Sequence, residues 1–437
     1  MRKISEENLQ FIGRLPEKAQ PQANLNIIKQ TRHYRLITPL FGGGAEAKKA
    51  DPIKIIRETS IRGQLRFWWR AIRGVGGLGD MREKEGRLFG NAGAAGETQP
   101  SQVSIFVKVE NVGKPDEPFE IDKGRPKMRR GTVVPFYASF PLQPSIEEAR
   151  ENPNRKMEEV LVGVQFTLQI SYPQDWQAEI EAALWAWETF GGIGGRTRRG
   201  FGAIQRIDAN LPQASEVASL IRSKLTEYLA VGEWDANAQF PHLTTSVDFS
   251  LTNRFNQANA DNCVKAWQHL IQRLHDFRQS PRIGNIYNGE SDWSEPDAIR
   301  RLSGRNAPYR EPTHSVGNKF PRANFGLPII FNFKDDDVKN RDPLPHMLKP
   351  QNYDRLSSPL VLRPIACAND GAVGLALILN TPPLPDVELT EMQPSGRVVS
   401  RGIVTTDLDS SNIANIPPMK AASPTETDVL KSFLKTI

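Results

Sequence analysis

Residues 191–202 read Gly-Gly-Ile-Gly-Gly-Arg-Thr-Arg-Arg-Gly-Phe-Gly, with six glycines and three arginines in twelve positions. The segment lies between a predicted helix over 176–190 and a predicted strand over 201–207, and a merely flexible turn is the alternative interpretation. Glycines let backbone amides approach phosphate groups, and arginines supply charge and forked donors for the same oxygens. We therefore predict a phosphate-binding loop formed by Gly192, Gly194, Gly195, Arg196, Arg198, Arg199 and Gly200.

Two familiar nucleotide-binding patterns do not fit this loop. The Gly-Lys-Ser/Thr signature of a P-loop is absent. The loop also follows a helix rather than a strand, and it does not match the Gly-x-Gly-x-x-Gly fingerprint of dinucleotide sites. The pattern thus favours the backbone of a nucleic acid as the ligand.

The elements before and after the loop define a repeating order. A stripe of Ile61, Leu65, Trp68, Trp69 and Ile72 predicts a helix that begins near Ser60, and strict alternation predicts a strand over 162–170. Further strands are predicted at 32–40, 103–109 and 133–140. The order strand, helix, strands, helix, strand is that of the ferredoxin-like βαββαβ unit.

The second half of the chain shows a weaker version of this pattern. A helix is predicted near 263–277, with strands at 325–333, 359–365 and 373–379 and a short helix at 427–434. A total of 437 residues exceeds one ordinary core. We predict an α+β protein with two RRM-like, ferredoxin-like domains over 1–215 and 216–437, with long inserted loops such as 280–323.

Four arginines of the helix near Ser60 form a second candidate site. Arg62, Arg66, Arg70 and Arg73 fall within about 80° of arc, and no Asp or Glu occurs between residues 59 and 74. Charged faces usually mix both signs, so this arginine ridge predicts contact with an anionic polymer. An ordinary solvated face is the alternative. The glycines after the first strand, which free the backbone for a tight turn, are predicted to join the RNA-binding surface as Gly42, Gly43 and Gly44.

Composition and cysteine usage limit the other possibilities. The net charge is only +6, so the placement of the arginines says more than their number. Cys263 and Cys367 stand in no CxxC or zinc-ligand spacing, which favours a reducing compartment. Neither a signal peptide nor a run long enough to span a membrane is recognised. We expect a soluble cytoplasmic protein without a membrane partner.

Catalytic patterns are sparse. None of the six histidines has metal-ligand spacing or belongs to a serine nucleophile motif. We therefore predict no catalytic residue, metal or cofactor and a protein that is not an enzyme. One rival function is a metal-independent endoribonuclease that uses His33 as a general base, although a histidine in a strand is more often structural. Another rival is a protein scaffold without RNA contact.

Several segments resemble the RAMP superfamily of CRISPR effector subunits. They are Thr-Pro-Leu-Phe-Gly-Gly-Gly-Ala at 38–45, Ser-Ile-Arg-Gly-Gln-Leu-Arg-Phe-Trp-Trp-Arg at 60–70 and Leu-Phe-Gly at 88–90. The loop 191–202 is similar to the glycine-rich loop of that superfamily. Phe-Gly-Leu-Pro-Ile at 325–329 and Arg-Leu-Ser-Ser-Pro-Leu at 355–360 resemble the subunit that caps one end of type III-B, or Cmr, complexes. Ser357 departs from that pattern, in which alanine is expected.

The resemblance implies a place in a ribonucleoprotein. It implies two ferredoxin-type domains at the head of a type III-B complex, near the 3′ region of the guide RNA. The implied partners are guide RNA, target RNA and the other Cmr RAMP and small subunits, and cleavage belongs to those partners. Together with the arginine-rich segments, it leads us to predict a noncatalytic RNA-binding subunit that helps to capture target RNA.

Overall fold

The structure is a computed structural model, and it describes residues 26–44, 46, 48–51, 53–91, 99–232, 234, 240–279, 291–306, 312–333 and 342–437. The first 25 residues and parts of the long segment predicted at 280–323 lie outside these ranges. Among the described helices, none is long and apolar enough to cross a membrane.

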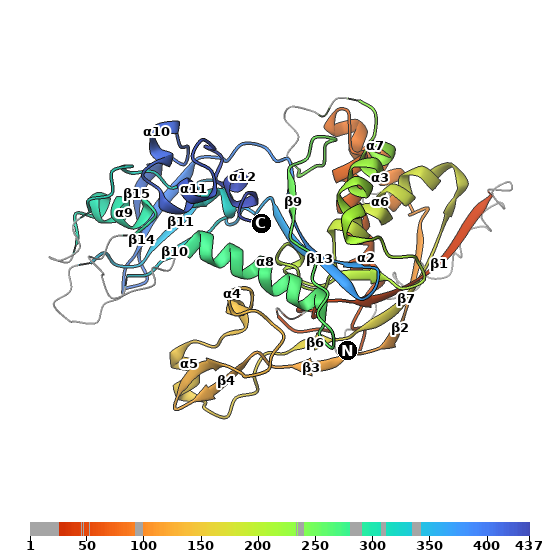
Figure 1. Cartoon of the computed structure of the whole chain (residues 1–437), viewed down its shortest axis with the longest axis horizontal. Coiled ribbons are helices and arrows are strands. Elements are labelled where there is room, and N and C mark those ends of the chain that lie inside the picture. The colour runs from red at the N-terminus through yellow and green to blue at the C-terminus, as the bar shows by residue number, and fades with distance from the viewer. Residues whose placement is uncertain are drawn as a thin grey trace, which may run out of the picture.

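A four-stranded antiparallel sheet organises the first half. Its strands are β1 (Ile27–Leu36), β2 (Ser104–Asn111), β7 (Gln165–Pro173) and β8 (Ile204–Arg206), in the order β2-β7-β1-β8 (Figure 1). Helix α2 (Glu58–Arg73) leads from β1 towards β2, and α6 (Gln177–Phe190) connects β7 to β8. This connectivity and strand order are those of a ferredoxin-like βαββαβ unit, as predicted for this half.

Apolar periodicity explains why these segments pack as they do. The stripe of α2 is buried, including Leu65 and Trp69, and it faces the sheet together with α6. Alternate residues of β7, such as Phe166, point to the same side, while the residues between them face away. The ring of Tyr34 in β1 lies 5.1 Å from that of Phe166 and 5.5 Å from that of Trp187. One face of the sheet is therefore covered by helices.

The chain between β2 and β7 forms a smaller subdomain. It contains β3 (Lys114–Asp116), β4 (Phe119–Asp122), β5 (Arg125–Met128) and β6 (Val160–Val162), paired as β3-β6 and β4-β5, and the short helices α4 (Phe136–Ser139) and α5 (Ile146–Glu151). The prediction of a strand at 133–140 is wrong, because this stretch forms α4 and the start of a 3-10 turn. Pro135 and Pro141 lack the N–H that a ladder needs, and proline suits the first turn of a helix.

The second half contains two sheets instead of one. Strands β9 (Phe249–Leu251), β12 (Leu360–Cys367) and β13 (Gly371–Ile378) pair in the order β12-β13-β9, and α8 (Asn262–Gln279) packs against them. A separate sheet has the order β10-β11-β14-β15, with bounds Ile329–Phe331, His346–Pro350, Val387–Met392 and Val398–Val404.

The predicted second βαββαβ unit is only partly present. The βαββ order of β9, α8, β12 and β13 matches three strands of such a unit, but no fourth strand joins them within the described ranges. After β13 the chain reads Thr-Pro-Pro-Leu-Pro at 381–385, and prolines disfavour both a helix interior and a central strand. The chain continues instead into β14 of the other sheet.

The remaining helices lie around these sheets. They are α3 (Leu78–Phe89), α7 (Val217–Tyr228), α9 (Glu295–Ser303), α10 (Ser410–Ile413), α11 (Pro417–Ala422) and α12 (Val429–Leu434). Single 3-10 turns occur at Phe140–Leu142, Gln174–Trp176, Thr197–Arg199, Ala214–Glu216 and Pro321–Phe325. In Figure 1 the sheet of β10, β11, β14 and β15 lies at the opposite end of the molecule from β1, with α8 and β13 between them.

The hydrophobic core crosses the predicted domain boundary at 215. One buried cluster contains residues of β1, α2 and α6 together with Val373 and Leu375 of β13. Arg363 of β12 is 2% exposed, and its guanidinium donates to the carbonyls of Gly191 at 2.7 Å and Ile204 at 2.8 Å. The division into 1–215 and 216–437 stays a prediction. The two halves are in contact through this shared core and through Arg363, and we call this contact region the seam.

Candidate nucleic-acid interface

The glycine-rich loop is closely packed against its neighbours. The Gly195 amide donates to the carbonyl of Phe41 at 2.7 Å, and a Cβ on Gly43 would lie 3.4 Å from Gly194, so the predicted glycine turn and the loop lie side by side. Gly200 has φ +82°, and a Cβ there would come within 2.5 Å of the Trp267 ring. Close packing explains these glycines, and the amides of Gly195 and Gly200 are occupied within the protein.

Two loop arginines connect the halves of the molecule. Arg199 donates from Nη1 to the carbonyl of Leu360 at 3.2 Å and from Nη2 to that of Phe325 at 3.3 Å. Arg198 donates to the carbonyl of Ser358 and lies 5.5 Å from the centre of the Phe67 ring in α2. Their charges therefore meet carbonyl dipoles and an aromatic face rather than carboxylates.

A fourth arginine joins the loop from α8. Arg278 donates from Nη1 to the Tyr137 hydroxyl at 2.9 Å, and its buried Nε has no hydrogen-bond partner. Arg196, in the left-handed conformation at φ +56°, also has a buried Nε without a partner. We call Arg196, Arg198, Arg199 and Arg278 the arginine cluster.

The electrostatics of the arginine cluster are unfavourable without a ligand. Burial, followed by repulsion from Arg278 and Arg196, lowers the pKa of Arg199 to about 9, so the group still carries its charge at neutral pH. Burial also lowers the pKa of Arg196, Arg198 and Arg278. The four guanidinium groups repel one another and have lost part of their hydration. An anion bound between them would replace the interactions that water no longer supplies.

One acid acts on the cluster from α9. The Glu295 charge opposes the lowering of the Arg278 pKa by burial; its Oε1 lies 3.1 Å from Nε of Arg322 and accepts from the Arg322 amide, while its buried Oε2 has no hydrogen-bond partner. Within the described part of the chain, no ion pair joins the arginine cluster to a carboxylate of its own. The cluster is thus a half-buried set of cations suited to phosphate oxygens.

The arginine ridge of α2 has a different environment. Arg66 Nε lies 2.6 Å from Glu85 Oε1, and Arg70 pairs with the same carboxylate, which is 5% exposed. Arg73 Nη2 lies 2.6 Å from Glu179 Oε1. No acid occurs within 59–74, but acids on α3 and α6 pair with three of the four ridge arginines, and contact of the ridge with an anionic polymer stays a prediction. Among the described residues, Arg62 has no ion pair.

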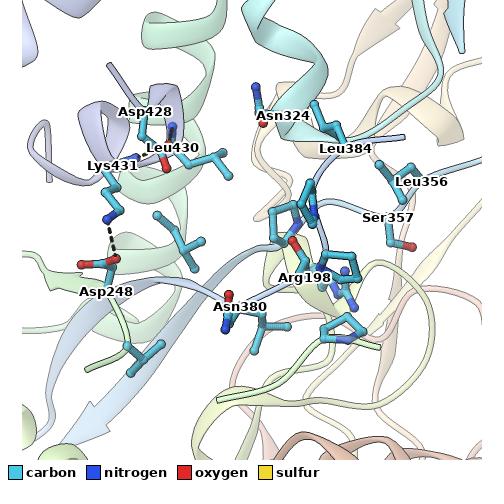
Figure 2. A pocket seen from close by; sticks show the side chains of 18 of the residues that line it. Arg198, Asp248, Asn324, Leu356, Ser357, Asn380, Leu384, Asp428, Leu430 and Lys431 are labelled. Carbon is cyan, nitrogen blue, oxygen red and sulfur yellow. Dashed lines mark hydrogen bonds and ion pairs between the residues drawn. The ribbon is translucent and has the colours of Figure 1, made fainter. Parts of the chain in front are cut away.

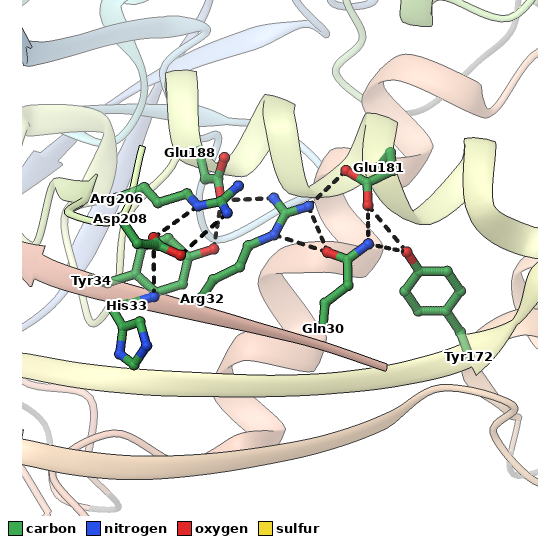
Figure 3. A network of polar contacts seen from close by, with 9 residues as sticks. All are labelled: Gln30, Arg32, His33, Tyr34, Tyr172, Glu181, Glu188, Arg206 and Asp208. Carbon is green, nitrogen blue, oxygen red and sulfur yellow. Dashed lines mark hydrogen bonds and ion pairs between the residues drawn. The ribbon is translucent and has the colours of Figure 1, made fainter. Parts of the chain in front are cut away.

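His33 lies on the other face of the first sheet. Figure 3 shows its ring on the opposite side of β1 from Arg32 and Tyr34. Its Nδ1 is 3.0 Å from the Thr167 hydroxyl, which in turn donates to Glu110 at 2.9 Å. No group of three or more metal-ligating side chains occurs in the described ranges.

A polar network fills the covered side of β1 (Figure 3). Arg32, 5% exposed, contacts Glu181 at 2.6 Å and Glu188 at 3.0 Å, and the Tyr34 hydroxyl donates to Glu188. Burial and then the Glu188 charge raise the pKa of Tyr34 well above its usual value. Each buried charge here has a partner, so the network joins α6 to the sheet, and removal of one partner would leave a buried charge uncompensated.

Sequence reasoning missed Arg278 and Tyr137. Arg278 follows the apolar stripe of α8, and its partner Tyr137 is 141 positions away in the chain. It also missed Arg57, which donates to the carbonyl of Gly43 at 2.6 Å and holds the glycine turn. The only local signal was a cation at the end of a helix, and that is common in any protein.

The fold and this site define a class of protein: a ferredoxin-like unit whose last loop carries glycines and uncompensated arginines. Residues 33–205 match the family model of the RAMP superfamily, which agrees with the resemblance of the motifs in this part of the chain. A comparison with curated proteins gives no match.

Solved structures similar to this chain include a single Cmr1 protein and a chain of a Cmr complex. The chain is similar to Cmr1 from Pyrococcus furiosus in its apo form, with a TM-score of 0.46 and 15% identity over 85% of this chain and 94% of that chain. It is also similar to a chain of the type III-B Cmr-beta complex bound to cognate target RNA, with a TM-score of 0.44 and 13% identity over 81% and 94% of the two chains. At these values the likeness carries no statement about function.

Proposed function

We propose that this chain is a noncatalytic, RNA-binding subunit of a type III-B CRISPR ribonucleoprotein, where it holds guide and target RNA near the 3′ region of the guide. The match to the RAMP superfamily and the resemblance of the motifs to Cmr subunits support the class of particle. The observation that carries the RNA-binding role is the arginine cluster, whose half-buried cations lack carboxylate partners of their own among the described residues.

The chemistry of the cluster favours a phosphate backbone over a specific base. Guanidinium groups match phosphate oxygens with paired donors, and such contacts position a strand without reading its sequence. A continuous RNA strand would supply several phosphates to one cluster. Helix α2 adjoins it, because Arg198 lies over Phe67, and a Cβ on Gly191 would come within 2.4 Å of the Trp68 ring nitrogen.

The position in the particle is tested by protection of the guide from nuclease. Particles assembled without this chain are expected to keep their guide but to lose protection towards its 3′ end, because the phosphate contacts of this subunit are missing. Substitution of the loop arginines Arg196, Arg198 and Arg199 by alanine should partly reproduce the shortening while the subunit stays bound. Unchanged 3′ protection in both particles would contradict the proposed position.

We also propose that the subunit does not cleave RNA. The ring of His33 contacts Thr167, and the described residues offer no metal-ligand group beside it. Purified subunit incubated with guide or target RNA, with and without magnesium, should leave both intact. Defined products that disappear in His33→Ala would instead establish the endoribonuclease.

A further inference from the structure

A groove beside the arginine cluster has no assigned role. Its volume is about 930 Å³, within the range of small-ligand sites, and it is lined by Arg198, the segment 353–359, the segment 378–385 and the start of α12 (Figure 2). Arg198 belongs to both the cluster and the groove. A strand held by the cluster would therefore reach the mouth of this groove.

The charges of the groove favour an anionic ligand. Asp248 is paired with Lys431, whose Nζ lies 3.4 Å from Oδ2, as the dashed line in Figure 2 marks. Asp428 accepts from the amides of Leu430 at 2.8 Å and Lys431 at 3.1 Å, so it caps α12. With both acids engaged, Arg198 and Arg355 remain without a carboxylate partner among the described residues.

The groove also offers surfaces for a base. Tyr353 lines the groove and is 62% exposed, so its aromatic ring is accessible to a ligand. The adjoining wall contains Pro382 and Pro383. Aromatic side chains stack on any base, and recognition of single-stranded RNA commonly uses such platforms.

The side-chain amide of Asn380 lines the groove and is held in place. Burial lowers the pKa of His242, which keeps its ring neutral, and its Nε2 lies 2.8 Å from Nδ2 of Asn380. The ring of Trp234 stacks on His242 with centroids 4.2 Å apart. With the Nδ2 of Asn380 held in this way, its Oδ1 is left as an acceptor for the edge of a base.

We propose that this groove binds one unstacked nucleotide of the RNA strand, with its base on Tyr353 and its phosphate between Arg198 and Arg355. The proposal rests on the RNA-binding role proposed above and adds a place for a base to it. Because stacking tolerates every base, the groove would select for a flexible single-stranded position rather than for a sequence.

The test uses the full-length protein and a short fluorescein-labelled oligouridylate that carries one photoreactive 4-thiouridine. We expect a crosslink within residues 353–359 and an affinity about tenfold lower in Tyr353→Ala, because the stacking contact is lost. Tyr353→Phe keeps the ring and should bind like the unmodified protein. Arg355→Ala should weaken binding, whereas Arg397→Ala, at an exposed arginine of the β14–β15 turn, is the matched control.

Substitutions in the arginine cluster distinguish the two proposals. If Tyr353→Ala and Arg355→Ala bind RNA normally while Arg196→Ala binds weakly, the groove holds no nucleotide and the proposed function stands. If none of the three changes binding, the proposed function falls as well. If Tyr353→Ala binds RNA normally but fails to enter the particle, the groove receives a protein segment, which also overturns the proposal.

Discussion

The arginine ridge of α2 and the arginine cluster look alike in the sequence but differ in the structure. The ridge and the three loop arginines of the cluster are both sets of arginines with no acid between them in the chain. In space, Arg66, Arg70 and Arg73 meet Glu85 and Glu179. The cluster meets carbonyl groups, a tyrosine hydroxyl and other arginines.

Acids that neutralise a basic helix can come from other elements of the fold, and spacing along the chain does not reveal them. The ridge arginines act as partners of acids on α3 and α6 and help to hold the three helices together. The cluster keeps its charge available to a ligand, at some cost to stability. We therefore expect substitutions in the ridge mainly to lower stability and substitutions in the cluster mainly to weaken RNA binding.

The largest expected effect is on RNA binding by the loop. Replacing Arg196, Arg198 and Arg199 together by alanine should weaken binding for all sequences and lower the slope of log affinity against log salt by about 2, or about 0.7 for each lost phosphate contact. Fluorescence anisotropy over a salt series measures the slope. An unchanged slope would mean that the loop does not bind phosphates, and a melting curve should confirm that the variant is folded.

The next effect is on stability through the ridge. Glu85→Gln leaves two partly buried arginines without their carboxylate and should lower the free energy of unfolding by about 1–3 kcal/mol, reduced by the exposure of the arginines. Urea denaturation measures the loss. Glu83→Gln, which breaks the exposed pair with Arg87, is the control and should cost less than about 0.5 kcal/mol. Equal losses in both would remove the distinction between the two regions.

A smaller effect separates charge from packing at Arg196. Arg196→Met keeps an unbranched side chain but removes the half-buried guanidinium, whose buried Nε has no hydrogen-bond partner. The free energy of unfolding should stay the same or rise by up to about 1 kcal/mol, while RNA affinity falls several-fold. A clear loss of stability would show that the Arg196 charge has a structural partner.

The smallest effect is expected at the ridge arginine that has no acid. Arg62→Ala should lower RNA affinity about two- to threefold by removing one half-buried cation that has no ion pair among the described residues. Arg73→Ala should leave affinity unchanged, because its charge is already neutralised by Glu179. Equal effects of the two substitutions on anisotropy would show that pairing with an acid does not decide which ridge arginines contact RNA.

Local periodicity predicted the first half well and the second half incompletely. The alternation around Phe166 and the stripe of α2 each encode one buried face, which fixes both the element and its orientation. The second half divides its strands between two sheets, and the choice of sheet depends on pairing across the chain. No pattern within β10 or β14 distinguishes those pairings from a second ferredoxin-like unit.

The candidate site was predictable only where its residues are consecutive. The three loop arginines stand within four positions and were found, although their carbonyl partners were not. Arg278 and Tyr137 are 141 positions apart, and Glu85 approaches Arg66 from 19 positions away on another helix. Contacts between residues this far apart in the chain depend on the tertiary fold, so composition and sequence spacing do not predict them.

The buried contact of Arg363 with the carbonyls of Gly191 and Ile204 sets an order of events during translation. The partners are 172 and 159 positions apart, so the first ferredoxin-like unit leaves the ribosome well before its seam can close. At about 5–20 residues per second, the Gly191 carbonyl waits for roughly 10 to 30 seconds. During that time the loop that carries three of the cluster arginines has no carbonyl partner from β12.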